Sequence, residues 1–292
     1  MSLKHHTIEA RGFKVHYVEW GSPKGIPLIL VHGFLDHARS WDPFVAAIEK
    51  ITKRSPWIIA PDCRGHGDSG WVGSGGYYHF PDYVLDLDAL ISSLKVSSVV
   101  LMGHSMGGTI SFLYSGTFPA RVKKLVLVEG VGPPGFSFSH APERMGKWIA
   151  EINASEQKRP VEYGSVEQMA ERLRQRDPRL NQKVALHVAR YGSKVTPTGK
   201  RVWKFDPLHR TSSPQPFYAG QALEFLRRIQ CPVLLVRGKE SRQVHRKDLG
   251  ERFDAIPRSK LVEIPRAGHM VHRNNPDALA RAVAAFVKSS KA

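Results

Sequence analysis

The sequence predicts an α/β protein in which a mostly parallel central sheet is flanked by helices and carries an inserted helical cap. Short apolar runs alternate with segments of helical periodicity, which is typical of a parallel sheet covered on both faces. One apolar run stops abruptly at Gly-His-Ser-Met-Gly, residues 103–107, and a small-residue helical segment follows. Strand-like runs then disappear between about Gly132 and Arg228.

The strands of the sheet are expected where apolar residues are continuous, because strands buried on both faces do not alternate. These runs are Pro27–Val31, Trp57–Ala60, Ser98–Met102, Leu125–Val128, Val233–Val236 and Leu261–Ile264. Upstream, Lys4–Ala10 and Phe13–Trp20 alternate around Arg11-Gly12, which predicts an antiparallel hairpin at the sheet edge. Helical patterns lie at Phe44–Ile51, Tyr83–Leu94, Met106–Thr117 and Asp277–Val287.

The segment without strand-like runs predicts an inserted cap subdomain, residues 133–228, with the core formed by residues 1–132 and 229–292. The segment is polar, charged, helical in pattern and interrupted by prolines. Spaced apolar side chains argue against a disordered excursion and are expected to pack against the core. They are Trp148, Met169, Leu173, Trp203 and Phe205.

Composition favours a protein that is neither exported nor membrane-spanning. The 292 residues are 41% hydrophobic, enough for a substantial core, and no apolar run approaches the roughly 20 residues that cross a bilayer. The N-terminal residues lack an apolar signal segment. Cys63 and Cys231 are expected to be reduced thiols at the edge of the core, which suits the cytoplasm.

The net charge of +17 and pI near 10 allow two interpretations. One is an anionic partner or substrate; the other is a solvated basic surface that aids solubility. The basic residues are spread along the chain, with many between Arg144 and Arg210, and they form no block of like charge and no nucleic-acid motif. We therefore favour the solvated surface and expect no specific nucleic-acid partner.

Ser105 is the candidate nucleophile. Gly103-His104-Ser105-Met106-Gly107 matches G-x-S-x-G, in which a serine stands on a sharp turn between a strand and a helix. Glycines are needed where strand and helix cross closely, and the turn directs the Met106 N–H toward a developing oxyanion. Five residues alone are a weak motif, but the strand and the helix on either side match it.

Two further loops follow strands at the same predicted edge of the sheet, where ligands bind in open α/β sheets. His32-Gly33-Phe34 is expected to supply a second oxyanion donor, the Phe34 N–H, although a simple glycine turn would give the same pattern. The segment from Asp62 to Ser69 has the pattern D-x-R-G-x-G-x-S. We interpret it as a buried structural turn beneath the site, with Asp62 not catalytic.

His269 is the candidate general base. It follows the strand at Leu261–Ile264 and precedes the final helix, and a serine hydroxyl needs a histidine to accept its proton. His272 is the alternative, although a surface or packing role is expected for it.

Two glutamates compete for the role of the carboxylate that orients the histidine. After Val233–Val236 a G-x-x-D pattern is expected, but the chain has Gly238-Lys239-Glu240-Ser241, with serine at the acid position. Glu129 ends the strand that follows the nucleophile helix. We favour Glu129 and keep Glu240 as the alternative acid; Glu129 could instead only hydrogen-bond a neighbouring loop.

These motifs, in this order and along the whole chain, resemble the α/β-hydrolase fold superfamily. Within it, residues 228–238 and Trp203-Lys204-Phe205-Asp206-Pro207 resemble the serine hydrolase-like proteins. Haloalkane dehalogenases are similar in placing a glutamate like Glu129, but they and epoxide hydrolases use an aspartate nucleophile where this chain has Ser105. The resemblance therefore disfavours both of those activities.

The expected function is a serine hydrolase, most simply a carboxylesterase of small to medium acyl esters, acting as a monomer or homodimer on a small-molecule ester. No metal and no organic cofactor is required. Aromatic candidates for the substrate pocket are Trp41, Phe136, Phe138 and Trp148. The same residues could serve a lactonase, a perhydrolase or a C–C bond hydrolase. A ligand-binding pseudoenzyme is a further alternative, suggested only by Ser241.

Overall fold

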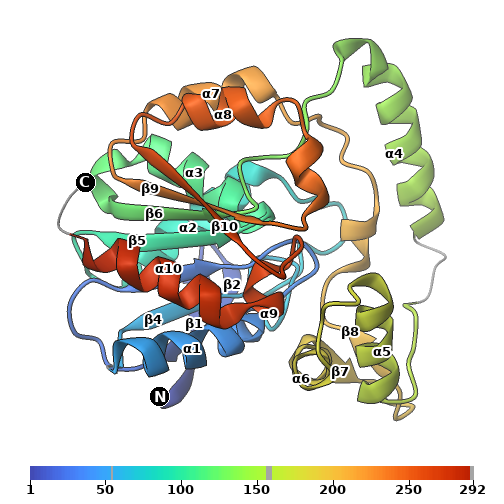
Figure 1. The fold of residues 1–292 in the computed structure, drawn as a ribbon. Coiled ribbons are helices and arrows are strands. Elements are labelled where there is room, and N and C mark those ends of the chain that lie inside the picture. Colours follow the sequence, from blue (N-terminus) through green and yellow to red (C-terminus); the bar gives the residue numbers. More distant parts are fainter. Residues whose placement is uncertain (54, 156–159, 290–292) are drawn as a thin grey trace.

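An eight-stranded sheet forms the centre of the molecule, in the order β1-β2-β4-β3-β5-β6-β9-β10 (Figure 1). The computed structural model describes residues 1–53, 55–155 and 160–289. The strands of this sheet are β1 (Leu3–Ala10), β2 (Phe13–Trp20), β3 (Leu28–Val31), β4 (Ile58–Pro61), β5 (Val99–His104), β6 (Val122–Val128), β9 (Val233–Gly238) and β10 (Ser259–Ile264). Each contains or overlaps a strand expected from the sequence.

The strand directions confirm a mostly parallel sheet. β1 pairs antiparallel with β2, and β2 antiparallel with β4, whereas β4, β3, β5, β6, β9 and β10 pair in parallel. Arg11 and Gly12 both have positive φ, 53° and 80°, which is the geometry of a tight hairpin turn that follows strand twist. Because the parallel strands run side by side, their carboxyl ends lie at one edge of the sheet.

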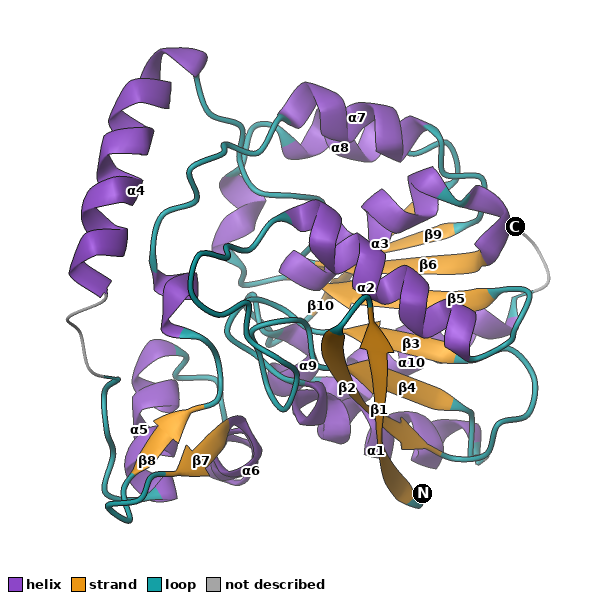
Figure 2. Cartoon of the chain, turned by 180° about the vertical axis from the view of Figure 1, so that it is seen from behind, coloured by secondary structure: helices purple, strands orange, loops and turns teal. Residues whose placement is uncertain are grey.

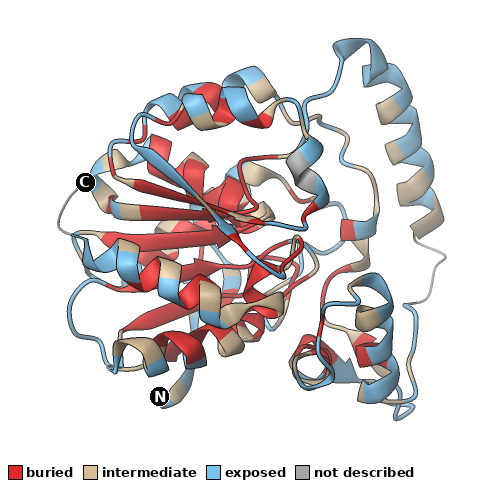
Figure 3. Ribbon diagram, viewed as in Figure 1, coloured by how far each residue is buried: buried red, intermediate tan, exposed pale blue. Residues whose placement is uncertain are grey.

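Helices cover both faces of the sheet. One face packs against α1 (Asp42–Thr52), α9 (Val271–Asn274) and α10 (Pro276–Lys288), and the other against α2 (Phe80–Ser93), α3 (Met106–Thr117), α7 (Ala219–Arg227) and α8 (Leu249–Asp254). Short 3-10 turns lie at Ala38–Trp41, Pro119–Arg121, Phe138–His140, Pro207–Arg210 and Arg242–His245. The buried residues gather in the strands and on the inner faces of these helices (Figure 3).

The inserted segment lies beside the core and has a small apolar cluster of its own (Figure 2). It contains α4 (Ala141–Ser155), α5 (Val166–Arg176), α6 (Gln182–Gly192) and two antiparallel strands, β7 (Ser193–Val195) and β8 (Arg201–Trp203). The insertion is mainly helical, and its two three-residue strands were not expected because they leave no apolar run in the sequence. None of the residues of α4 is buried.

The last residues of the predicted cap, up to residue 228, pack with the core. α7 lies on α3, and its Leu223 and Leu226 belong to the main apolar cluster of the core. We therefore use "cap segment" below for residues 133–218.

Both cysteines, Cys63 and Cys231, are free and buried, as expected. Within the described ranges no helix combines the length and apolar character needed to span a membrane.

The close crossing of β5 and α3 gives a stability prediction. A methyl group on Gly103 would lie 2.2 Å from the carbonyl oxygen of Gly107. Gly103→Ala should therefore lower the free energy of unfolding by about 1–3 kcal/mol, the usual cost of overpacking. Gly146→Ala, in α4 with nothing within 4 Å, is the matched control and should stabilise slightly. Equal urea midpoints for the two variants would contradict this account.

Candidate active site

Ser105 stands at a strained turn between β5 and α3. Its backbone angles, φ 51° and ψ −114°, lie in a region that L-residues rarely adopt. The turn is tight enough that a methyl group on Gly107 would meet the Val31 carbonyl oxygen at 2.2 Å. The neighbouring strand and helix therefore hold the serine in a conformation that it would not keep alone.

His269 connects the serine to a carboxylate. Its Nε2 lies 3.0 Å from the Ser105 Oγ, and its Nδ1 lies 3.3 Å from Glu129 Oε2. These residues come from the ends of β5 and β6 and from the loop after β10. The structure thus brings together the serine, the histidine and the favoured glutamate.

Glu129 is buried and accepts hydrogen bonds through both carboxylate oxygens. Oε1 accepts from the Gly238 N–H at 2.7 Å, and Oε2 accepts from the Ser241 hydroxyl at 2.8 Å. Its backbone has a positive φ of 53°. Ser241, the residue at the position where an acid was expected, therefore donates to the glutamate. Sequence reasoning missed this role, although the residue's position in the G-x-x-S segment was the available signal.

Glu240 does not face the histidine. Its carboxylate accepts from Arg179 Nε of the cap segment at 2.6 Å, and its side chain is 45% exposed. The backbone turn at Gly238–Ser241 directs consecutive side chains to different sides, so a shift of one residue changes the partner. The alternative placement of the acid at Glu240 has no support in this geometry.

The loop that carries His269 is fixed from two sides. His104 Nε2 lies 2.8 Å from the His269 carbonyl oxygen and donates to it. The Asn274 amide accepts from the Gly268 N–H at 3.0 Å and donates to Asp177 of the cap segment at 2.7 Å. None of these supporting residues was singled out from the sequence, because only the folded chain brings them to the loop.

The two expected oxyanion donors lie on backbone segments beside Ser105. A methyl group on Gly33 would lie 3.3 Å from the Ser105 Cβ, so the Gly33-Phe34 loop passes directly over the serine. Met106 begins α3, and the first N–H groups of a helix have no intrahelical acceptor. Both N–H groups therefore belong to segments next to the nucleophile.

Comparison with known proteins identifies the family. A sequence profile described as the alpha/beta hydrolase family matches residues 28–282. The chain belongs to this family. A probable serine hydrolase of Drosophila melanogaster is 28% identical over 93% of this chain and 83% of its own length, and human serine hydrolase-like protein 2 is 24% identical over 92% and 89%. The thioesterase domain from the curacin biosynthetic pathway superposes with a TM-score of 0.87, at 25% identity over 98% of this chain and all of that domain.

The match and the names of the relatives support a serine hydrolase of the α/β-hydrolase superfamily, similar to the serine hydrolase-like proteins, as the sequence motifs indicated.

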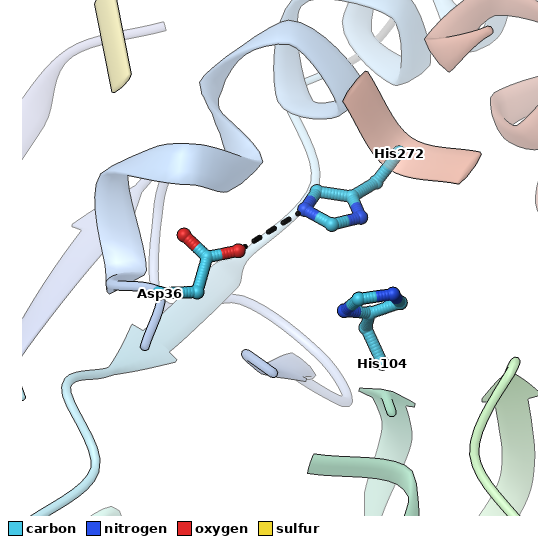
Figure 4. Close-up of side chains that lie close together, drawn as sticks. All are labelled: Asp36, His104 and His272. Carbon is cyan, nitrogen blue, oxygen red and sulfur yellow. Dashed lines mark ion pairs between the residues drawn. The ribbon is translucent and has the colours of Figure 1, made fainter. Parts of the chain in front are cut away.

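Asp36, His104 and His272 form a buried polar cluster (Figure 4). The centre of the His104 ring lies 4.9 Å from the centre of the His269 ring. Asp36 Oδ2 lies 3.4 Å from His272 Nε2, and the carboxylate forms an ion pair with Arg273. Burial lowers the pKa of His104 and of His272, so both rings are neutral near pH 7. Asp36, His104 and His272 each bring a potential metal ligand to within 4.8 Å of the others. The Arg273 guanidinium already compensates the Asp36 carboxylate, which favours a structural role.

Two residues in and beside this cluster, His272 and Trp41, are buried. His272 was expected at the surface or in packing, and it is fully buried against the Trp41 ring, with centroids 4.5 Å apart. Trp41 was proposed as a pocket residue, and this was wrong: its exposed fraction is 0% and it packs in the core under α1.

The remaining pocket candidates lie on the outer part of the cap segment. Phe136 and Phe138 are 49% and 74% exposed, with Arg144 and Tyr218 respectively as neighbours. Trp148 on α4 packs against Tyr77. The contacts that these side chains make lie within the cap segment and with Tyr77, so a place for them in the wider entrance stays a prediction.

Asp62 anchors the turn that links β4 to the region below the site. Its carboxylate accepts from His16 Nδ1 at 2.7 Å and from the backbone N–H groups of Ala38 and Asp68 at 2.7 and 2.9 Å. Burial alone would raise the pKa of Asp62, but the hydrogen bond and charge of His16 and the other donors lower it well below the usual range. The expected structural role is consistent with these contacts.

Asp62 therefore gives a pH-dependent stability prediction. Because its pKa is depressed in the folded state, its contribution is present above the unfolded-state pKa and is lost as the pH falls toward the folded-state pKa. Asp62→Asn should lower the free energy of unfolding by about 1–3 kcal/mol near pH 7, since buried donors lose their acceptor. The difference from wild type should shrink below about pH 4. Denaturant unfolding of wild type and variant near pH 7 and below about pH 4 measures this difference in the free energy of unfolding. A difference that does not change with pH would contradict the role assigned to Asp62.

Proposed function

We propose that this serine hydrolase is a carboxylesterase of small to medium acyl esters that acts through Ser105, His269 and Glu129. The observation that carries the proposal is the continuous hydrogen-bond series from the Ser105 hydroxyl through both ring nitrogens of His269 to a buried carboxylate. The same arrangement activates a serine for acyl transfer on several unrelated folds.

The geometry assigns the protons. For the Ser105 hydroxyl to donate to His269 Nε2, that nitrogen must be the unprotonated one, so Nδ1 carries the hydrogen and donates to Glu129 Oε2. The hydrogen bonds from Gly238 and Ser241 keep the carboxylate oriented toward the ring. The carboxylate would then stabilise the imidazolium that forms when the serine is deprotonated.

The reaction follows in two acyl-transfer steps. Ser105 Oγ attacks the carbonyl carbon while His269 Nε2 takes the hydroxyl proton. The N–H groups of Phe34 and Met106 stabilise the tetrahedral oxyanion, and His269 returns the proton to the departing alcohol. Water, deprotonated by His269, then attacks the acyl-enzyme and releases the acid and free Ser105. None of these steps calls on a metal or an organic cofactor.

One observation supports an acyl substrate, and another argues against the pseudoenzyme alternative. One structural relative is named a thioesterase domain, whose substrates share the acyl group. The pseudoenzyme alternative depended on Ser241 replacing an acid, and a glutamate carboxylate now lies 2.8 Å from that serine. Lactone opening, perhydrolysis and C–C cleavage would use the same residues, so substrates must separate them.

Hydrolysis of p-nitrophenyl esters from acetate to long chains tests the reaction. Wild type should release p-nitrophenol with a preference for short and medium chains, and Ser105→Ala should lose about 10³-fold or more of kcat, because no other side chain replaces the nucleophile. A fluorophosphonate probe should label wild type and not the variant. Absence of both labelling and turnover would overturn the esterase proposal.

Paired glutamate variants test the acid. Glu129→Gln should lower kcat by about 10³- to 10⁴-fold, since an amide neither fixes the tautomer nor stabilises the imidazolium. Glu240→Gln removes only an exposed ion pair with Arg179, so kcat/KM should change less than about fivefold. The two variants differ from wild type by the same atoms, which makes each the control of the other. The reverse order of effects would move the acid to Glu240.

A further inference from the structure

We propose that a cavity between the cap segment and the core binds a terminal carboxylate of the substrate, so that the preferred esters are anionic. This inference rests on the proposed function, because it concerns the substrate of the same Ser105 site. The cavity has a cationic side, an apolar side and a buried floor that contains an arginine, which together describe a chain ending in a carboxylate.

The cationic side comes mainly from α5. Arg172 and Arg176 both line the cavity, and residues four apart share one face of a helix. Arg210, after the β8 strand, lines it as well, with its guanidinium 5.1 Å from the centre of the Phe205 ring. In the part of the chain that the structure describes, none of these arginines forms an ion pair, whereas Arg174 on the same helix pairs with Glu171.

The floor is formed by the core. Arg273 lines the cavity, is 6% exposed, and pairs with Asp36. Its Nε is buried and has no hydrogen-bond partner among the described residues. Asp36 is the lone carboxylate among the described residues lining the cavity, and Arg273 compensates it. The uncompensated charge around the cavity is therefore positive.

The size of the cavity and the residues that line it fit a chain that ends in a carboxylate. The cavity volume is about 60 Å³, several times the space that one water needs. Leu35, Leu173 and Phe205 provide an apolar wall for the methylene groups leading to it. Guanidinium groups bind carboxylates with paired hydrogen bonds that a neutral chain end cannot make.

Two residues that line the cavity are close in sequence to the proposed catalytic loops. Leu35 directly follows Phe34, whose N–H is the proposed oxyanion donor, and Arg273 lies on α9, immediately after the His269 loop. In the proposal, a substrate whose carbonyl group sits at Ser105 extends one end past Leu35 into the cavity. A general basic surface would not concentrate arginines without ion pairs and apolar side chains around one hollow.

Matched esters test the proposal. The first pair is p-nitrophenyl hydrogen adipate against p-nitrophenyl hexanoate, with the carboxylate on the acyl side. The second is 4-acetoxybutyrate against butyl acetate, with the carboxylate on the alcohol side. In one of the pairs, at about 0.15 M salt to screen long-range attraction, kcat/KM should be at least about tenfold higher for the anion. Equal values within both pairs would overturn the subsite while leaving the esterase function intact.

Arginine variants locate the effect. Arg172→Gln combined with Arg176→Gln should lower the anion-to-neutral ratio by about threefold for each guanidinium removed, mainly through KM. The ratio does not depend on the fraction of variant that folds. Arg227→Gln on α7, which loses a surface pair with Glu224, is the matched control and should keep the wild-type ratio. Equal losses in the cavity variant and the control would show general electrostatic attraction and contradict the subsite.

A binding measurement separates this proposal from the catalytic one. Methyl hydrogen adipate, which keeps one terminal carboxylate, should bind Ser105→Ala more tightly than neutral methyl hexanoate in calorimetry, and the cavity variant should abolish that difference. If no ester is hydrolysed but the anionic ester still binds more tightly in this way, the catalytic proposal fails and the anion site stands. If esters are hydrolysed and the anionic ester binds no more tightly than the neutral one, the anion site fails.

Discussion

The buried Glu129 carboxylate ties together the parts of the chain that must meet at the nucleophile. It leaves the end of β6, accepts from the loop after β9 through Gly238 and Ser241, and faces the loop after β10 through His269. A buried carboxylate is costly unless it is hydrogen-bonded or paired. Each bond that lowers this cost also fixes one of the loops, so the same interaction serves stability and alignment.

Strain at two neighbouring strand ends accompanies this arrangement. Ser105 and Glu129 both have φ near 50°, and each follows a parallel strand of the same sheet. Their loops touch: a methyl group on Gly130 would lie 2.9 Å from the Ser105 backbone nitrogen, and one on Gly108 would lie 2.4 Å from the Gly130 carbonyl oxygen. Non-glycine residues keep such angles only where the surroundings leave no alternative. Glycine at 108 and 130 permits the approach that holds both side chains toward His269.

The sequence carried enough information for the strands of the core and for the placing of Ser105 and His269 at one edge of the sheet, because their signals are local. Continuous apolar runs marked the strands, and glycines on either side of Ser105 marked the turn. The acid was harder because its identity depends on which strand end faces His269, and the choice of Glu129 used the position of β6 as well as residue type. Trp41 was misassigned because an aromatic residue near a site motif looks the same in sequence whether it lines a pocket or fills the core. Asn274, His104 and Asp177 acquire their partners only through folding.

The cap segment is coupled to the reacting groups and does not merely cover them. Asp177 accepts from Asn274, which in turn holds the Gly268 N–H, while Arg179 pairs with Glu240 next to Ser241. One short turn of the cap therefore contacts both the loop that carries His269 and the loop that positions Glu129. The same segment presents Arg172 and Arg176 to the cavity from the helix that ends just before this turn. A ligand held by those arginines and by Arg273 would link α5 to α9 across the cavity. This link would be in addition to the Asp177–Asn274 hydrogen bond, which also joins the cap segment to α9. Under the proposed function, substrate binding and the alignment of His269 would both depend on how the cap segment contacts the core.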